Sequence, residues 1–160
     1  MPITFGNLKS NLRIDESSLA LLSYLKEFFV ESDIDAFLVG GFLRDVLLGK
    51  LAPDIDIAIH GDAIFYGQKL AEITKGKLII LDGSRRIVRV VLDKQNGFLF
   101  DHIDVSEISG SIEEDLADRD FTVDSMAVPM SCISNEIPIN NLIDLFGGLR
   151  DLRSGAIRTV

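Results

Sequence analysis

Apolar residues recur along the chain with two different periods, and each period predicts its own kind of element. Steps of three and four residues over 17–31 predict an amphipathic helix, and the serines at its start are candidate caps. The same spacing predicts a second helix over 62–74 and a short helix over 112–118. The residues of the second helix that we expect to be buried are Ile64, Phe65, Leu70, Ala71 and Ile73.

Alternating or continuous apolar runs predict the strands. A helical turn followed by a strand is expected over 121–130, and loop with a short helix is expected over 142–158. Another helix is expected after Gly40-Gly41, ending at Gly49. The other predicted strands are 36–39, 54–59, 77–81, 87–92 and 98–105.

These elements predict one domain of the α+β class. A chain of 160 residues with 47% hydrophobic composition can bury one good core, and it contains no internal repeat or linker. We expect a mixed or antiparallel sheet of about five strands, with helices packed mainly on one face. Residues 1–32 would form an N-terminal extension and helix, and residues 33–160 the core that carries the chemistry.

Composition excludes several classes of protein. A single cysteine, Cys132, and two histidines argue against a disulfide framework and a Cys- or His-based zinc site. No stretch reaches the roughly 20 apolar residues of a membrane span, so a cytoplasmic location and no membrane partner are expected. The net charge of −9 argues against this chain alone wrapping a polynucleotide.

Two aspartates stand out in the segment DIDIAI. Because side chains alternate along a strand, Asp54 and Asp56 share the face opposite the isoleucines, with Cα atoms about 6 to 7 Å apart. Oxygen ligands of this kind favour Mg²⁺ or Mn²⁺, and a two-metal phosphoryl-transfer site holds its ions roughly 3.5 to 4 Å apart. Taken alone, such a pair is more often the polar face of a half-buried strand than a metal site.

The residues upstream favour a phosphate site. Gly40 and Gly41 allow close approach to the backbone at the start of a helix, where free N–H groups attract an anion. Arg44 stands one turn further on. A third carboxylate is expected from a neighbouring strand, and spacing alone does not choose between Asp101 and Asp104.

Three ordered segments carry a resemblance to a known family. GGFLRDVLLGKLAPDIDIAIHGDA, SIEEDLADRDFTVDSMAV and LIDLFGGLRDLRSGAIRTV are similar to the signatures of the class II tRNA nucleotidyltransferases and bacterial poly(A) polymerases, within the DNA polymerase β-like superfamily. The resemblance covers residues 37–160. It implies template-independent transfer of a nucleoside monophosphate from ATP or CTP to an RNA 3′ end, in tRNA or poly(A) synthesis.

The resemblance also implies roles for individual residues. Two Mg²⁺ or Mn²⁺ ions would bind Asp54, Asp56 and Asp104, and Asp104 falls where the family has an acidic residue on the adjacent strand. Gly40, Gly41 and Arg44 would hold the triphosphate, with Asp45 supporting Arg44. Arg119 and Asp120 would contact the phosphates and ribose of the nucleotide.

The chain departs from the family at several points. Asp118 and Asp124 stand where the family has arginine and asparagine, and the short loop 106–110 lacks the usual arginine. The base-selecting motif E-D-x-x-R does not occur, so a helical neck and RNA-binding domains that grip tRNA are expected to be absent from these 160 residues. A small-molecule nucleotidyltransferase and a catalytically silent nucleotide-binding module remain alternatives.

Three further candidates have ordinary explanations beside functional ones. His60 at a strand end is either a surface residue or a base, and Cys132 either a small core residue or a nucleophile. Arg85, Arg86 and Arg89 form either a solvated strand face or a contact for the RNA end or triphosphate.

Overall fold

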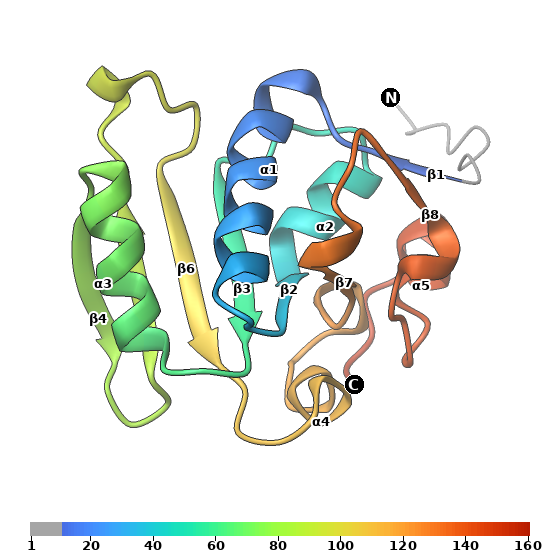
Figure 1. Ribbon diagram of the computed structural model, residues 1–160. Helices are drawn as coiled ribbons and strands as arrows, with labels where there is room; N and C mark the ends of the chain where they lie inside the picture. Colours follow the sequence, from blue (N-terminus) through green and yellow to red (C-terminus); the bar gives the residue numbers. More distant parts are fainter. Residues whose placement is uncertain (1–10) are drawn as a thin grey trace.

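A six-stranded mixed sheet in the order β4-β5-β6-β3-β2-β7 organises the computed structural model, which describes residues 11–160 (Figure 1). Only β3 and β6 run parallel; the other neighbours are antiparallel. The α+β class is confirmed, with one strand more than about five. The strands are β2 Ala36–Val39, β3 Asp54–Ile59, β4 Lys77–Asp82, β5 Ile87–Val91, β6 His102–Glu107 and β7 Ala127–Pro129.

The predicted helices are present with small changes at their ends. The cap of the first helix is Asp15, which accepts a hydrogen bond from the backbone N–H of Ser18, so the serines are not the cap. None of the described helices combines the length and apolarity of a membrane span. The helices are α1 Glu16–Glu31, α2 Gly40–Leu47, α3 Ala63–Thr74, α4 Ile112–Ala117 and α5 Gly148–Ser154, with single 3₁₀ turns η1 Lys94–Asn96, η2 Thr122–Asp124, η3 Met130–Cys132 and η4 Ile139–Asn141.

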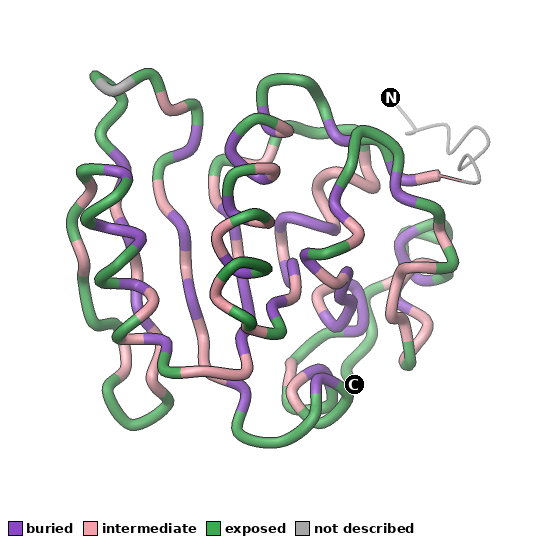
Figure 2. Tube along the Cα trace, viewed as in Figure 1, coloured by how far each residue is buried: buried purple, intermediate pink, exposed green. Residues whose placement is uncertain are grey.

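One face of the sheet carries the main core. The isoleucines of β3 are at most 1% exposed and pack with side chains of α1, α2 and α3 (Figure 2). Burying each such side chain contributes about 1.5–3 kcal/mol. The predicted stripe of α3 is partly wrong, because Phe65 and Ile73 are exposed. Leu70 and Ala71 are buried as predicted, and the helix also buries Ala63, Gly67 and Thr74.

The opposite face of the sheet is divided. At the β2 and β7 side, α4 covers a smaller apolar cluster that includes Val39, Ala58 and Leu116. Toward β5 and β6 the same face carries charged side chains. The isoleucines of β3 thus point into the main core, and its aspartates point to the charged part of the opposite face.

Strand β6 begins later in the chain than the apolar pattern predicts. It begins at His102, so residues 98–101 lie before it and do not alternate between its faces. Phe100 is buried in the main core. The strand predicted over 98–105 therefore begins four residues later than expected and extends to Glu107.

A two-stranded antiparallel sheet was not expected from the sequence. It pairs β1 Asn11–Arg13 with β8 Glu136–Pro138. It lies beside the end of the main sheet where β7 and α5 are found (Figure 1). Residues 1–10 of the expected N-terminal extension lie outside the described residues.

The C-terminal segment holds the stretch that follows α4. Thr122 donates a backbone hydrogen bond to the carbonyl of Arg158 and a side-chain hydrogen bond of 2.8 Å to Asp151, which is fully buried. The backbone N–H of Val160 donates to the carbonyl of Asp120. Residues 120–122 are therefore held in place by the last residues of the chain.

Gly148 allows α5 to lie against η2. A Cβ atom at Gly148 would lie 2.2 Å from the carbonyl oxygen of Thr122, closer than any side chain can approach. We expect Gly148→Ala to lower the free energy of unfolding by about 1–3 kcal/mol, because backbone must shift to admit the methyl group. Chemical denaturation checks this.

Gly83→Ala is the matched control, because nothing lies within 4 Å of its added Cβ atom. A Gly148→Ala protein as stable as this control would show that α5 does not pack tightly on η2.

Candidate active site on the charged face of the sheet

The pairing of β3 with β6 brings two of the predicted carboxylates together. Asp56 lies directly opposite Asp104, and Asp54 lies opposite His102. Neighbouring strands are about 4.8 Å apart, so the two carboxylates are close neighbours on one face. Asp101 precedes β6 and pairs with Lys94. The strand register thus puts Asp104, and not Asp101, beside the aspartates of β3.

Asp56 lies in an unfavourable electrostatic environment. Burial raises its pKa, and the negative charges of Asp104 and Asp54 raise it further. The positive charge of Arg119 and a hydrogen bond from the backbone of Phe42 offset only part of this effect. A partly buried carboxylate beside a like charge is a site where a cation would be stabilised.

Arg89 binds Asp104 through two parallel hydrogen bonds. Its Nε donates to Oδ1 and its Nη2 to Oδ2, each over 2.7 Å. The sequence indicated only a basic cluster around this residue. Arg89 lies opposite Asp104 because β5 pairs with β6 in this register. The sequence alone does not give that register, so it did not reveal the contact.

His102 lies between the carboxylates of Asp54 and Asp104. Its Nδ1 is 2.9 Å from Oδ1 of Asp54, and its Nε2 is 3.8 Å from Oδ2 of Asp104. The Nδ1 contact is short but is not directed as a hydrogen bond, because Oδ1 of Asp54 is buried and has no hydrogen-bond partner among the described residues. The position of His102 was not predicted, since nothing in the sequence places it opposite Asp54.

The donor set fits a hard divalent cation. Asp54, Asp56 and Asp104 offer carboxylate oxygens on adjacent strands, and one oxygen of Asp54 lacks a hydrogen bond. Within residues 11–160, no three His, Cys, Asp or Glu side chains are grouped closely enough to bind a metal ion as they stand. In this arrangement both oxygens of Asp104 accept hydrogen bonds from Arg89.

The glycine pair lies against these carboxylates. α2 begins at Gly40 directly after β2, and no side chain caps it. A Cβ atom on Gly40 would lie 3.2 Å from both Oδ2 of Asp56 and Nη1 of Arg119, and the residue has a φ of +67°, which favours glycine. One on Gly41 would lie 3.2 Å from Nη2 of Arg44. The fold thus gathers residues that are 16 to 79 positions apart around the start of α2.

Arg44 contacts two carboxylates. Its Nε donates to Asp45 over 2.9 Å and its Nη1 to Asp124 over 2.7 Å. The hydrogen bond to Asp45 raises the pKa of the Arg44 guanidinium, and Asp124 adds to the effect. The contact with Asp45 agrees with the expected support of Arg44, and Asp124 is a second partner that the sequence did not reveal.

Arg119 and Asp120 follow α4. Arg119 donates to Oδ2 of Asp115 from Nη2 over 3.0 Å and from Nε over 3.3 Å. Its other terminal nitrogen, Nη1, is the atom that lies beside Gly40. Asp120 is exposed, and its backbone is held by the end of the chain.

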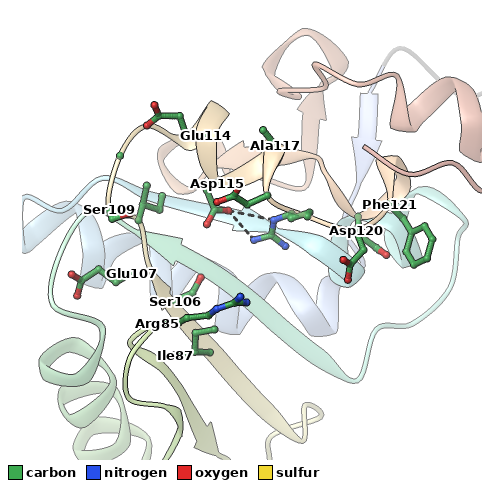
Figure 3. Close-up of a pocket in the computed structure, with 15 residues that line it drawn as sticks. Arg85, Ile87, Ser106, Glu107, Ser109, Glu114, Asp115, Ala117, Asp120 and Phe121 are labelled. Atoms are coloured by element: carbon green, nitrogen blue, oxygen red, sulfur yellow. Dashed lines mark hydrogen bonds and ion pairs between the residues drawn. The ribbon is translucent and has the colours of Figure 1, made fainter.

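A cavity of about 1070 Å³ opens beside these residues. Figure 3 shows Arg85, Ile87 and Ser106 on one side, and Asp115 with the end of α4 on the other. The dashed lines at Asp115 mark its contacts with Arg119. None of Asp54, Asp56 and Asp104 lines the cavity, and on β6 its wall starts at Ser106, two residues beyond Asp104. Its volume is that of a small-molecule site.

The remaining sequence candidates lie elsewhere. His60 is within 2.8 Å of the carbonyl oxygen of Gly110, and Cys132 packs against the main core. Arg86 pairs with Asp62 and Glu107. These contacts give each residue a structural role.

Known proteins resemble the chain over most of its length. The family described as poly(A) polymerase head domain matches residues 36–158. The A-adding tRNA nucleotidyltransferase of Geobacter sulfurreducens is 28% identical, over 94% of this chain and 18% of its own. The CC-adding tRNA nucleotidyltransferase of Synechocystis sp. is 35% identical, over 78% of this chain and 28% of its own.

Solved structures show the same similarity. The Thermotoga maritima CCA-adding enzyme complexed with tRNA has a TM-score of 0.75 and 34% identity, over 92% of this chain and 33% of its own. A CCA-adding enzyme in complex with CTP has a TM-score of 0.75 and 33% identity, over 92% of this chain and 34% of its own. The chain therefore spans about a third or less of the length of these relatives.

Removing the charge of Asp56 is expected to stabilise the fold. Because the pKa of Asp56 is raised in the folded protein, its ionisation opposes folding, and this destabilisation grows as the pH rises above the ordinary pKa of the carboxyl and is complete above the raised one. Asp56→Asn should raise the melting temperature at pH 7 in EDTA. The gain should vanish below about pH 3.9, where the carboxyl is protonated in both states. Circular dichroism across pH gives the readout.

Asp118→Asn serves as control, because it removes the same charge from an exposed position. A lower melting temperature for Asp56→Asn at pH 7 would show that the attraction of Asp56 to Arg119 outweighs its burial.

Proposed function

The chain belongs to the poly(A) polymerase head-domain family, and from this and its clustered carboxylates we propose that it transfers a nucleoside monophosphate from ATP or CTP to an RNA 3′ hydroxyl. A tRNA is the proposed acceptor, in accord with the relatives' names. One observation carries the proposal: Asp54, Asp56 and Asp104 lie on adjacent strands, and Asp56 faces the start of α2 and Arg119.

We assign Asp54, Asp56 and Asp104 to two Mg²⁺ or Mn²⁺ ions. When bound, such ions lower the pKa of the attacking hydroxyl and neutralise charge on the phosphates. The three residues supply negative charge and oxygen donors on one face. The raised pKa of Asp56 supports the assignment, since its repulsion from Asp104 is relieved by positive charge.

The triphosphate is assigned to the start of α2. The uncapped backbone there has free N–H groups, and Gly40 and Gly41 leave room for close approach. Arg44 and Arg119 supply positive charge beside the two glycines. Asp45 and Asp115 orient these guanidinium groups through their hydrogen bonds.

The nucleoside is assigned to the neighbouring cavity. Arg119 and Asp120 both line it, and we assign Asp120 to the ribose. In the reaction the RNA 3′ oxygen attacks the α-phosphorus in line, the bond to the β-phosphate breaks, and pyrophosphate leaves. Positioning and charge stabilisation are then the main contributions of these side chains.

RNA is expected to be bound mainly by polypeptide outside these 160 residues. The net charge of −9 offers little attraction to RNA phosphates, and the relatives are about three or more times as long. We propose that residues 33–160 act as a catalytic head and that other polypeptide makes most of the RNA contacts.

A silent nucleotide-binding head is the second candidate. It is favoured by the contact between Arg44 and Asp124, which engages a proposed phosphate ligand with an internal carboxylate. The two candidates are separated by incubating the chain with labelled ATP or CTP, Mg²⁺ and tRNA lacking its terminal nucleotides, beside calorimetry with the same nucleotides. The tRNA is raised until the signal no longer changes, because this chain alone is expected to bind RNA weakly. Binding without incorporation would support the silent head, and incorporation into aminoglycosides in a parallel reaction would indicate a small-molecule enzyme.

Loss of either aspartate of β3 should abolish transfer. Asp54→Ala and Asp56→Ala remove proposed metal ligands without opening a cavity in the apolar core. We expect each rate to fall by well over about tenfold, a loss of more than roughly 1.4 kcal/mol of transition-state stabilisation. Label incorporation gives the rate, and circular dichroism the fold. Activity above about a tenth of the parent would contradict the assignment of these residues.

Selectivity among the four ribonucleotides should be poor. The proposed contacts from Gly40, Gly41, Arg44, Arg119 and Asp120 meet phosphate and ribose, which all nucleotides share. We expect the dissociation constants for ATP, CTP, GTP and UTP to agree within about tenfold. Calorimetry in Mg²⁺ measures them. A hundredfold preference for ATP or CTP would place base recognition within these residues.

A further inference from the structure

The side-chain contact between Arg89 and Asp104 is a bidentate ion pair on the charged face of the sheet. Arg89 stands on β5 directly opposite Asp104 on β6, and two hydrogen bonds of 2.7 Å join the guanidinium to both carboxylate oxygens. The side chains are 34% and 20% exposed. Paired, charge-assisted hydrogen bonds in a partly buried place are stronger than ordinary surface ion pairs.

The positive charge of Arg89 acts on more than one carboxylate. Its hydrogen bond to Asp104 raises the pKa of the guanidinium, and the charges of Asp54 and Asp56 raise it as well. Arg89 therefore supplies positive charge to all three carboxylates that the proposed function assigns to metal.

A divalent cation and Arg89 compete for the same oxygens. A cation that uses Asp104 needs at least one of its two oxygens, and both now accept hydrogen bonds from Arg89. Loss of one such bond to a charged group changes an equilibrium constant by about tenfold or more. The arrangement of strands β5 and β6 thus determines how readily Asp104 can act as a ligand.

We propose that Arg89 is a displaceable counter-ion that masks Asp104 and lowers the affinity of the carboxylate cluster for a divalent cation. This inference rests on the proposed function, which assigns Asp104 to the metal. In the opposite role, Arg89 would be a positioning residue that fixes the Asp104 carboxylate in the orientation in which it binds the cation. The two roles predict opposite effects when Arg89 is replaced, because masking weakens metal binding and positioning strengthens it.

The experiment is a titration of the 160-residue chain with Mn²⁺, with free ion measured by electron paramagnetic resonance and no nucleotide present. Arg89→Met should tighten Mn²⁺ binding by about tenfold, or roughly 1.4 kcal/mol. Arg89→Lys keeps the charge but cannot form the two parallel bonds, so it should tighten binding by a smaller factor. Equal affinity for Arg89→Lys and the parent would show a through-space effect without masking, and would overturn the proposal.

Two matched variants isolate the contact. Arg153→Met removes the same charge from an exposed position on α5, outside the proposed site, and should change Mn²⁺ affinity by less than about twofold at 0.15 M salt. In an Asp104→Asn background, adding Arg89→Met should tighten Mn²⁺ binding by a smaller factor than it does in the parent, because only the through-space effect of Arg89 on Asp54 and Asp56 remains. An equal or larger factor in this background would contradict masking.

The remaining outcomes distinguish a failure of the masking role of Arg89 from a failure of the metal assignment. Weaker Mn²⁺ binding by Arg89→Met, in a protein that keeps its circular dichroism spectrum, would establish positioning and overturn masking. Asp56→Asn should remove most Mn²⁺ binding. If it leaves the affinity unchanged, the metal assignment in the proposed function fails, whatever Arg89 does.

Discussion

The parallel register of β3 and β6 is the constraint on which the site depends. It sets Asp56 directly opposite Asp104 on one face and the isoleucines of β3 in the core on the other. A shift by one residue would turn both sets of side chains over. The packing of the isoleucines in the core therefore holds two carboxylates close together. The free energy gained by burying the isoleucines offsets the repulsion between the carboxylates.

Internal ion pairs compensate the charges that this register concentrates. Arg89 binds Asp104. Arg119 donates a hydrogen bond to Asp115, and its Nη1 atom lies beside Gly40, as does Oδ2 of Asp56. Arg44 is held by Asp45 together with Asp124. Substrate and cation binding at these groups would be an exchange of partners, so the affinity depends on the difference between internal and external contacts.

The C-terminal segment holds residues 120–122 in place, next to Arg119 of the proposed site. Asp151 is fully buried, and the hydrogen bond from Thr122 lowers the pKa of its carboxyl, assisted by the charges of Arg158 and Arg150. Residues 120–122 are also bridged to the last residues of the chain. The approach of Arg119 to Gly40 thus depends on contacts made far from the carboxylates.

The sequence by itself determined the local features of this protein. The alternation in DIDIAI predicts both the strand and the shared face of Asp54 and Asp56, and the glycine pair predicts the start of α2. These features follow from backbone geometry within a few residues, which local spacing records. The resemblance of three segments extended this reading to the family and to Asp104.

Only the tertiary structure decided which distant side chains meet. The contact of Arg44 with Asp124 spans 80 positions, and that of Arg89 with Asp104 depends on how β5 pairs with β6. The buried side of α3 was mispredicted for the same reason, since its period shows that one face is apolar but not where the sheet lies. Strand order and register arise from burial summed over the whole chain, and no local pattern contains that sum.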